Sequence, residues 1–209
     1  MPIVRLQGLL HEYWSKPMVS STQSRAPKPQ SVTVELNFDT LNITYRWWSA
    51  KYLFLIFFCI AWDSFLVFWY SMASRGAPWI MIVFPIGHVA VGIALTYYTI
   101  AGFINRTVMS VGPQWLTVTH GPLPWFGNKR IDKMELSQLY AEELRSQSSR
   151  GGTSFSYQLN TVLRDNTKLK LLAGLPSPDV ARFIEQTVED HLHMEDTPVI
   201  GEMPKTGMQ

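Results

Sequence analysis

The sequence holds a single cysteine, Cys59, among its 209 residues. One thiol cannot close an intrachain disulfide or supply a Cys-X-X-Cys zinc site, so both scaffolds are excluded. The sequence also has little excess of one charge over the other, because 18 basic and 16 acidic residues leave a net charge of +2. General nucleic-acid binders carry a much larger basic excess, so we expect no nucleic-acid partner.

Catalytic signatures are missing as well. No serine stands in a G-x-S-x-G context, no phosphate-binding glycine loop is present, and His191 and His193 lack the i, i+4 spacing of a helical zinc site. We therefore predict a protein that is not an enzyme, with neither catalytic residues nor a metal site.

Charged residues are nearly absent from two long stretches. Residues 52–73 carry one charge in 22 residues, and residues 78–104 carry none in 27. About 20 apolar residues in a helix cross a hydrocarbon core of about 30 Å, so both stretches predict transmembrane helices. Pro85 predicts a kink in the second helix. The short connection, with Gly76 and Pro78, predicts a tight turn and therefore a transmembrane hairpin.

Basic residues are distributed unevenly around this hairpin. Arg75 alone lies in the turn, whereas basic residues precede the first stretch and follow the second: Arg5, Lys16, Arg25, Lys28, Arg46, Lys51, Arg106, Lys129, Arg130 and Lys133. The positive-inside rule then predicts that both termini are cytoplasmic, in the inner membrane if the source is a bacterium.

Asp63 is the one charged residue inside either stretch, and a carboxylate near the bilayer centre costs about 3 kcal/mol or more unless it is paired, neutral or hydrated. Asp63 lies 12 residues before Arg75 and His88 lies 13 after it, so both lie roughly 18 to 20 Å from the turn. We predict a structural hydrogen bond or ion pair between Asp63 and His88. The alternatives are a proton relay through both residues, or a haem or chlorophyll-type pigment ligated by His88. Close helix packing is predicted at small residues, namely Ala61, Ser64, Ser71, Ala90, Ala94 and Ala101.

Alternating apolar residues predict β-strands on both sides of the hairpin. Two β-hairpins are expected around Asp39-Thr40 and Gly112-Pro113, an extended piece over residues 129–143, and a further hairpin around Asp165-Asn166. Together these make seven antiparallel strands. Ser177 and Pro178 then predict the start of an amphipathic helix, whose apolar stripe is Val180, Phe183, Ile184, Val188 and Leu192.

Seven short antiparallel strands closed by one helix is the element order of a pleckstrin-homology-like (PH-like) domain. Residues 121–143, GPLPWFGNKRIDKMELSQLYAEE, combine a glycine-containing loop, a basic pair and a strand of IDxxEL type. In this run the sequence resembles bacterial proteins that couple two membrane helices to a PH-like domain. The resemblance covers residues 32–193 and implies a cytoplasmic module of a fold that binds proteins, peptides or lipid headgroups.

The expected fold is thus a two-helix membrane hairpin inserted into a mainly antiparallel β, PH-like domain with a C-terminal amphipathic helix. Its expected segments are an N-terminal short helix and disordered tail (1–30), a first β-hairpin (31–49), the membrane hairpin (52–104), the rest of the PH-like domain (105–193) and a C-terminal tail (194–209).

Two surface features predict contacts. Leu123, Trp125 and Phe126 form an apolar loop tip, which we expect to meet a partner or the membrane interface rather than its own domain; Trp14 is a further candidate. A basic edge, made of Lys129, Arg130 and Lys133, is a candidate for contact with anionic headgroups, each residue contributing about 1 kcal/mol. An ordinary solvated strand face is the favoured interpretation, because residues from 106 onward carry 11 basic against 12 acidic side chains.

These features favour a non-enzymatic membrane accessory or scaffold subunit, whose partners are integral membrane subunits and the lipid bilayer. One alternative is a proton- or lipid-responsive sensor or transport element that uses Asp63 and His88. Another is a subunit that binds haem or pigment at His88, which would be its only cofactor.

Overall fold

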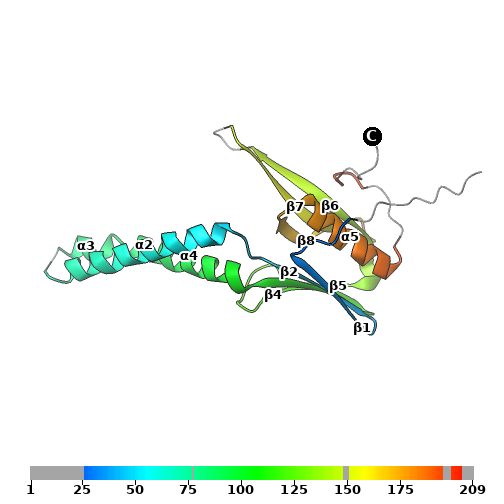
Figure 1. Ribbon diagram of the computed structural model, residues 1–209, viewed down its shortest axis with the longest axis horizontal. Coiled ribbons are helices and arrows are strands. Elements are labelled where there is room, and N and C mark those ends of the chain that lie inside the picture. The colour runs from blue at the N-terminus through cyan, green and yellow to red at the C-terminus, as the bar shows by residue number, and fades with distance from the viewer. Residues whose placement is uncertain (1–25, 77, 148–150, 195–198, 204–209) are drawn as a thin grey trace, which may run out of the picture. The chain divides into compact units, whose positions relative to one another are not determined.

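The computed structural model describes residues 26–76, 78–147, 151–194 and 199–203 (Figure 1). Within them, two antiparallel sheets are accompanied by helices, of which two are long and apolar enough to cross a membrane. The N-terminal helix predicted around Trp14 lies outside the described residues.

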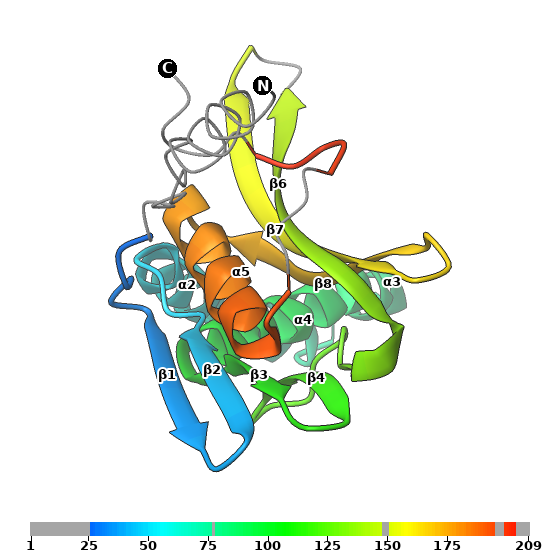
Figure 2. The ribbon, with the colours of Figure 1, turned by 90° about the vertical axis from the view of Figure 1, so that its right-hand side faces the viewer.

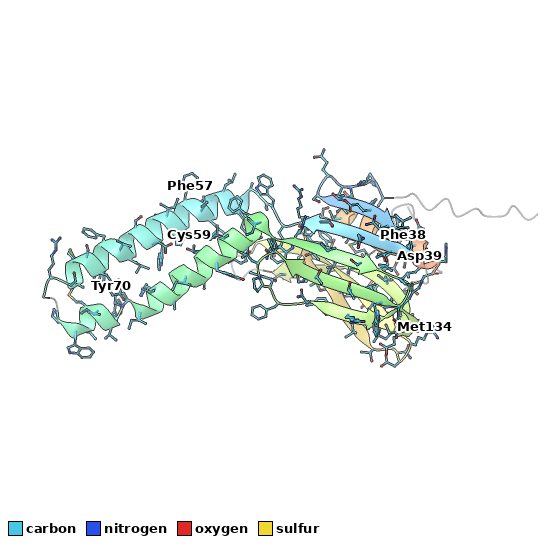
Figure 3. The ribbon with its side chains drawn as sticks, turned by 90° about the horizontal axis from the view of Figure 1, so that it is seen from below. Phe38, Asp39, Phe57, Cys59, Tyr70 and Met134 are labelled. Carbon is cyan, nitrogen blue, oxygen red and sulfur yellow. The ribbon has the colours of Figure 1, made fainter. Side chains whose placement is uncertain are left out.

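The two apolar stretches are helical over almost the whole of their predicted lengths. The first forms α2 (Lys51–Ala73), and the second forms α3 (Trp79–Val83) and α4 (Ile86–Ile104). The axes of α2 and α4 run side by side, and Figure 3 shows Cys59 on the side of α2 that faces α4, with Phe57 on the opposite side.

The predicted kink at Pro85 is a break between α3 and α4. Proline has no N–H, so the carbonyl of Met81, four residues earlier, loses its usual helical donor. Side chains of α2 donate to carbonyls at this break instead. Trp69 Nε1 donates to Met81 O at 2.9 Å, and the Tyr70 hydroxyl donates to Ile82 O at 3.2 Å.

The first sheet is interrupted in sequence by the helix pair and is continuous in space. Its strands, in spatial order, are β1 (Val32–Asn37), β2 (Thr40–Arg46), β3 (Arg106–Val111), β4 (Trp115–Gly121) and β5 (Lys129–Asp132). Strands β2 and β3 pair antiparallel across the insertion, with Arg46 opposite Arg106 and Leu41 opposite Val111. The chain therefore leaves this sheet at β2 and returns beside it at β3.

The second sheet contains β6 (Leu136–Gln147), β7 (Thr153–Leu163) and β8 (Lys168–Leu175), in that order. The predicted turn between β7 and β8 is confirmed, and Asn166 adopts a φ of 65° there. Asparagine tolerates this left-handed conformation better than most residues.

The strand count differs from the sequence-based prediction, because eight strands occur among the described residues instead of seven. The extended piece predicted over residues 129–143 is divided by a 3-10 turn, η1 (Lys133–Glu135). Asp132 caps this turn by accepting a hydrogen bond from Met134 N at 2.9 Å. The turn sends β5 into the first sheet and β6 into the second.

Helix α5 (Pro178–Leu192) covers the core, as its apolar stripe predicts. Ser177 Oγ accepts a hydrogen bond from Val180 N, which confirms the predicted N-cap. Figure 2 shows α5 lying between β2 of the first sheet and β6 of the second, and it contacts both. Residues of both sheets and of α5 form the core, among them Ile43, Met109, Val118, Leu139, Leu159, Ile184 and Val188.

Part of the predicted C-terminal tail belongs to this fold. Met203 is buried in the core, and its N–H donates to Ala141 O on β6 at 2.9 Å. Lys168 Nζ donates to Ile200 O at 3.1 Å. Residues 199–203 therefore cover an edge of β6 that would otherwise offer unpaired backbone groups.

Candidate functional site

Asp63 lies at a polar seam between α2 and α4. Its Oδ2 accepts a hydrogen bond from Thr96 Oγ1 at 3.0 Å, and the carboxylate is half-buried. One turn away along both helices, Cys59 Sγ lies 3.5 Å from Thr99 Oγ1, and both of these residues are buried. The seam therefore joins the two helices through side chains at the middle of α2.

Glycines allow the close helix approach at this seam. A Cβ on Gly92 would stand 2.9 Å from Asp63 Oδ1, and a Cβ on Gly102 would overlap the ring of Tyr52. Of the small residues predicted for this role on α4, Ala101 is fully buried, whereas Ala90 and Ala94 are exposed. The sequence-based prediction of close-packing residues did not include Gly92 or Gly102. Glycine has no side chain and is itself a signal of close helix packing, so both could have been included.

The predicted contact between Asp63 and His88 is not formed, and this part of the prediction is corrected. His88 lies against Trp62, with ring centroids 5.8 Å apart, and against Phe84 at 5.6 Å. Trp62 Nε1 also donates to the His88 carbonyl at 3.3 Å. Equal depth is not enough for contact, because successive residues on α2 point about 100° apart and Trp62, not Asp63, faces His88.

Two neighbouring hollows open beside the seam, with volumes of about 670 and 700 Å³. Both are lined by Asp63, Val67, Thr96 and Ile100, which we call the Asp63 groove. Apart from Asp63, side chains that carry a formal charge are missing from the linings of both hollows. A carboxylate that faces an apolar groove is an arrangement that structural packing alone does not require.

The loop at residues 121–128 packs against the end of α4 through Trp125 and Leu123. Trp125 lies 6.3 Å from Tyr97 and 5.1 Å from Trp47, measured between ring centroids. Asn105, which is buried, accepts from Leu123 N at 2.8 Å and donates to Leu123 O at 3.1 Å. Trp125 and Leu123 are thus partly covered by their own chain.

Phe126 differs from its neighbours in this loop, because its side chain is 92% exposed. Of the three residues predicted to meet a partner or the membrane interface, it is the one whose surface is fully available. The Tyr97 hydroxyl donates to Pro124 O at 2.6 Å and holds the neighbouring backbone.

His120 lies beside this loop, with its ring 5.6 Å from that of Trp47, and we call the rings of Trp47, His120 and Trp125 the aromatic junction. Its Nδ1 lies 2.8 Å from Thr107 Oγ1, which also accepts from Trp47 Nε1 at 2.8 Å. Burial lowers the pKa of His120 from its ordinary value, and a backbone hydrogen bond at Gly127 opposes this shift. The neutral imidazole is therefore favoured in the folded protein.

The basic edge is engaged within its own sheets. Lys129 Nζ donates to Lys170 O, and the Arg130 guanidinium lies 4.1 Å from the centroid of the Trp115 ring. Arg130 pairs with Thr117, which pairs with Ser110, four residues along β3 from its start. At about 3.3 Å per residue, Arg130 is about 13 Å from the end of α4, and Lys133 lies farther along. Attraction to anionic headgroups at the end of α4 would decay within a Debye length of about 8 Å. The register therefore favours a solvated strand face over headgroup contact.

Among the residues that the structure describes, no group of three His, Cys, Asp or Glu side chains could hold a metal ion. Two inward-facing carboxylates of the β part accept hydrogen bonds from the protein itself. Glu185 accepts from Ala141 N at 3.0 Å, and Glu142 accepts from Gln158 and Asn160 at 2.6 Å each.

No protein-family model and no curated protein matches the chain. Its function is therefore inferred from its residues and their geometry.

Proposed function

We propose that this protein is a non-enzymatic integral membrane accessory or scaffold subunit, anchored by α2 and the α3–α4 segment as a transmembrane hairpin. The observation that carries the proposal is the exposure of its two apolar helices. Only 17% of the most apolar window of Lys51–Ala73 and 11% of that of Trp79–Ile104 are buried. A core helix of a soluble protein buries its apolar side chains, so this surface is suited to lipid and to other membrane helices.

The β part acts in this proposal as a PH-like module. Two antiparallel sheets followed by a covering C-terminal helix support this assignment, and the short strand β5 is an addition to the seven-strand pattern. A scaffold role suits such a module, because folds of this kind present surfaces and edges for binding. Phe126 is the exposed apolar side chain that the loop offers for such a contact.

Both flanks of the helix pair lie on the cytoplasmic side in this proposal, in the inner membrane of a bacterial cell. The pairing of β2 with β3 supports a common side, because one sheet cannot be assembled across a bilayer. The basic residues outside the turn favour the cytoplasmic face.

A labelling experiment tests this orientation. Single cysteines are placed at Ser74, exposed in the turn, and at Ser154, exposed on β7, in a chain that carries Cys59→Ala. In intact spheroplasts, a membrane-impermeant maleimide is expected to label Ser74→Cys and to reach Ser154→Cys only after the membrane is opened. Labelling of both sites before opening would contradict the orientation.

Affinity purification from native membranes in a mild detergent tests the scaffold role. We expect an integral membrane protein to be recovered in a fixed molar ratio, identified by mass spectrometry. Recovery of the chain alone under every gentle condition would overturn the proposal. A visible absorption scan of the same sample tests the pigment alternative, which predicts a Soret or pigment band that His88→Gln removes.

The sensor alternative is less well supported by the geometry. It requires Asp63 and His88 to exchange a proton, whereas Asp63 bonds Thr96 and His88 stacks on Trp62. The scaffold proposal needs no such exchange.

A further inference from the structure

The Asp63 groove combines two properties that are seldom found together in a membrane helix pair. It is apolar along its length, and a carboxylate lies at its centre. The hollows extend along α2 from Ile56 to Tyr70, which is about 21 Å of helix at 1.5 Å per residue. This length is most of a hydrocarbon core of about 30 Å, so the groove suits an elongated occupant.

The helix pair supplies no positive charge beside this carboxylate. Thr96 supplies one hydroxyl donor, and Asp63 Oδ1 lies toward Gly92, which has no side chain to offer. Arg75 is the only Lys or Arg between residues 52 and 104, and its 12-residue separation from Asp63 corresponds to about 18 Å along a helix. His88 lies at a similar depth but contacts Trp62 and Phe84 instead of Asp63, so a positive charge beside this carboxylate must come from another molecule.

We propose that the Asp63 groove binds a transmembrane helix of a partner subunit that carries a Lys or Arg at the depth of Asp63. The inference rests on the proposed membrane-subunit function and specifies the surface and the chemistry through which docking occurs. An intramembrane carboxylate and an intramembrane cation each cost free energy in lipid, and pairing them in the groove removes both costs. Only a helix satisfies its own backbone within the membrane at this length.

Other occupants leave the carboxylate without a counter-charge. A lipid acyl chain fills the apolar surface and supplies no cation. A second copy that docks groove to groove by two-fold symmetry brings one Asp63 against the other, and like charges repel. His88 of a second copy is poorly placed for the role, because it lies outside both hollows and contacts Trp62 and Phe84.

Site-specific photo-crosslinking identifies the occupant. The photoreactive residue p-benzoylphenylalanine is placed at Val67, which lines both hollows, or at Phe57, which lines neither. These two side chains are equally exposed, at 72% each, so Phe57 is a matched control (Figure 3). The full-length protein is irradiated in native membranes, purified by its affinity tag, and the crosslinked peptide is sequenced by mass spectrometry.

From Val67 we expect an adduct with an apolar segment of another protein, bearing a Lys or Arg within about one helical turn of the crosslinked residue. From Phe57 we expect at least tenfold less of this adduct. An adduct confined to lipid, to a second copy of this chain, or to a segment without a basic residue overturns the inference.

The charge is then tested with Asp63→Asn and Asp63→Glu. Asparagine keeps the volume and can still accept from Thr96, so the helix pair is preserved while the charge is removed. We expect Asp63→Asn to reduce the Val67 adduct at least tenfold and Asp63→Glu to retain most of it. Equal adduct yields from Asp63→Asn and the wild type overturn the inference.

These outcomes separate the groove from the general proposal. If a membrane protein co-purifies but does not crosslink to Val67, the groove inference is wrong and the scaffold proposal stands. If no membrane protein co-purifies, both are wrong.

Discussion

Asn105 connects the last turn of α4 to the loop at residues 121–128 through both atoms of its amide. The side chain is 2% exposed, and it bonds the N–H and the carbonyl of Leu123. A buried amide that satisfies two backbone groups stabilises a structure mainly because its removal leaves those groups unpaired. Asn105 therefore fixes where Trp125 lies against Tyr97 and Trp47.

Replacing Asn105 with Ala is expected to lower the free energy of unfolding by about 1 to 3 kcal/mol, because the two backbone groups of Leu123 lose their partner. Asn37→Ala is the control, since Asn37 is exposed at the end of β1. Thermal unfolding in detergent, followed by tryptophan fluorescence, measures both variants. Equal unfolding temperatures would contradict the role given to Asn105.

Gly102 and Gly87 offer a matched comparison within α4. A Cβ at Gly102 would overlap the Tyr52 ring, whereas a Cβ at Gly87 meets nothing within 4 Å. Gly102→Ala is expected to destabilise the helix pair by about 1 to 3 kcal/mol through overpacking, and Gly87→Ala is expected to be neutral or slightly stabilising. The unfolding temperatures of the two variants in the same detergent check this. A loss in Gly87→Ala as large as that in Gly102→Ala would show that the Tyr52 contact is unimportant.

Sequence reasoning found Asp63 but not its partner. Asp63 could be found because it is the only charged residue in its apolar stretch. Thr96 and Gly92 could not, because Thr99, Gly87 and Gly102 are residues of the same types in the same stretch. Counting residues from the turn gives depth and leaves the helix face undetermined. The face depends on how two helices cross and on the break at Pro85, and both are properties of packing.

Among the elements, the break at Pro85 shows how α2 and the α3–α4 segment depend on each other. A proline in a membrane helix leaves a carbonyl without its helical donor. The bilayer core contains no water that could donate to this carbonyl instead. Trp69 donates to the carbonyl of Met81, and Tyr70 to that of Ile82. The break is therefore tolerated because α2 lies beside it.

Trp69→Phe is expected to destabilise the helix pair by about 1 to 3 kcal/mol, because the Met81 carbonyl loses its donor. Trp79→Phe is the control, since Trp79 is 72% exposed and the Met81 carbonyl keeps its bond from Trp69 in that variant. The decisive measurement is a double-mutant cycle. A Pro85→Ala background restores the backbone N–H at position 85, which can bond Met81 O, so Trp69→Phe is expected to cost less there. An equal cost in both backgrounds would show that the indole bond does not compensate for the proline.

Most elements could be predicted from the sequence because their patterns are local. Alternation around Asp165-Asn166 specified one hairpin, and Ser177 with Pro178 specified the start of α5. The division between β5 and β6 could not be predicted, because Lys133–Glu135 contains no glycine, proline or asparagine that would mark a turn. Which sheet each strand joins is decided by long-range pairing with β4 and with β7.

Across the whole molecule, the polar residues before and after the helix pair form a single unit. β1 and β2 join β3 only after the chain has passed through α2, α3 and α4. The aromatic junction lies where these parts meet, and it includes Trp47 from the first part and His120 and Trp125 from the second. A change of charge at this junction therefore affects the stability of the whole fold.

His120 makes this stability depend on pH. Its pKa is lowered in the folded protein by burial, relative to an ordinary value near 6.5 in the unfolded chain. The unfolded chain therefore binds the proton more readily, so stability is fully present above about pH 6.5 and is lost as the pH falls toward the lowered folded pKa. Urea unfolding midpoints at steps between about pH 7.5 and 5.5 are expected to decrease in the wild type and to decrease less in His120→Gln. His191→Gln, in the last turn of α5, is the control and is expected to show the wild-type decrease. If His120→Gln retains the full wild-type decrease over this range, protonation of His120 is not its cause, and carboxylates elsewhere in the β part become the groups to test.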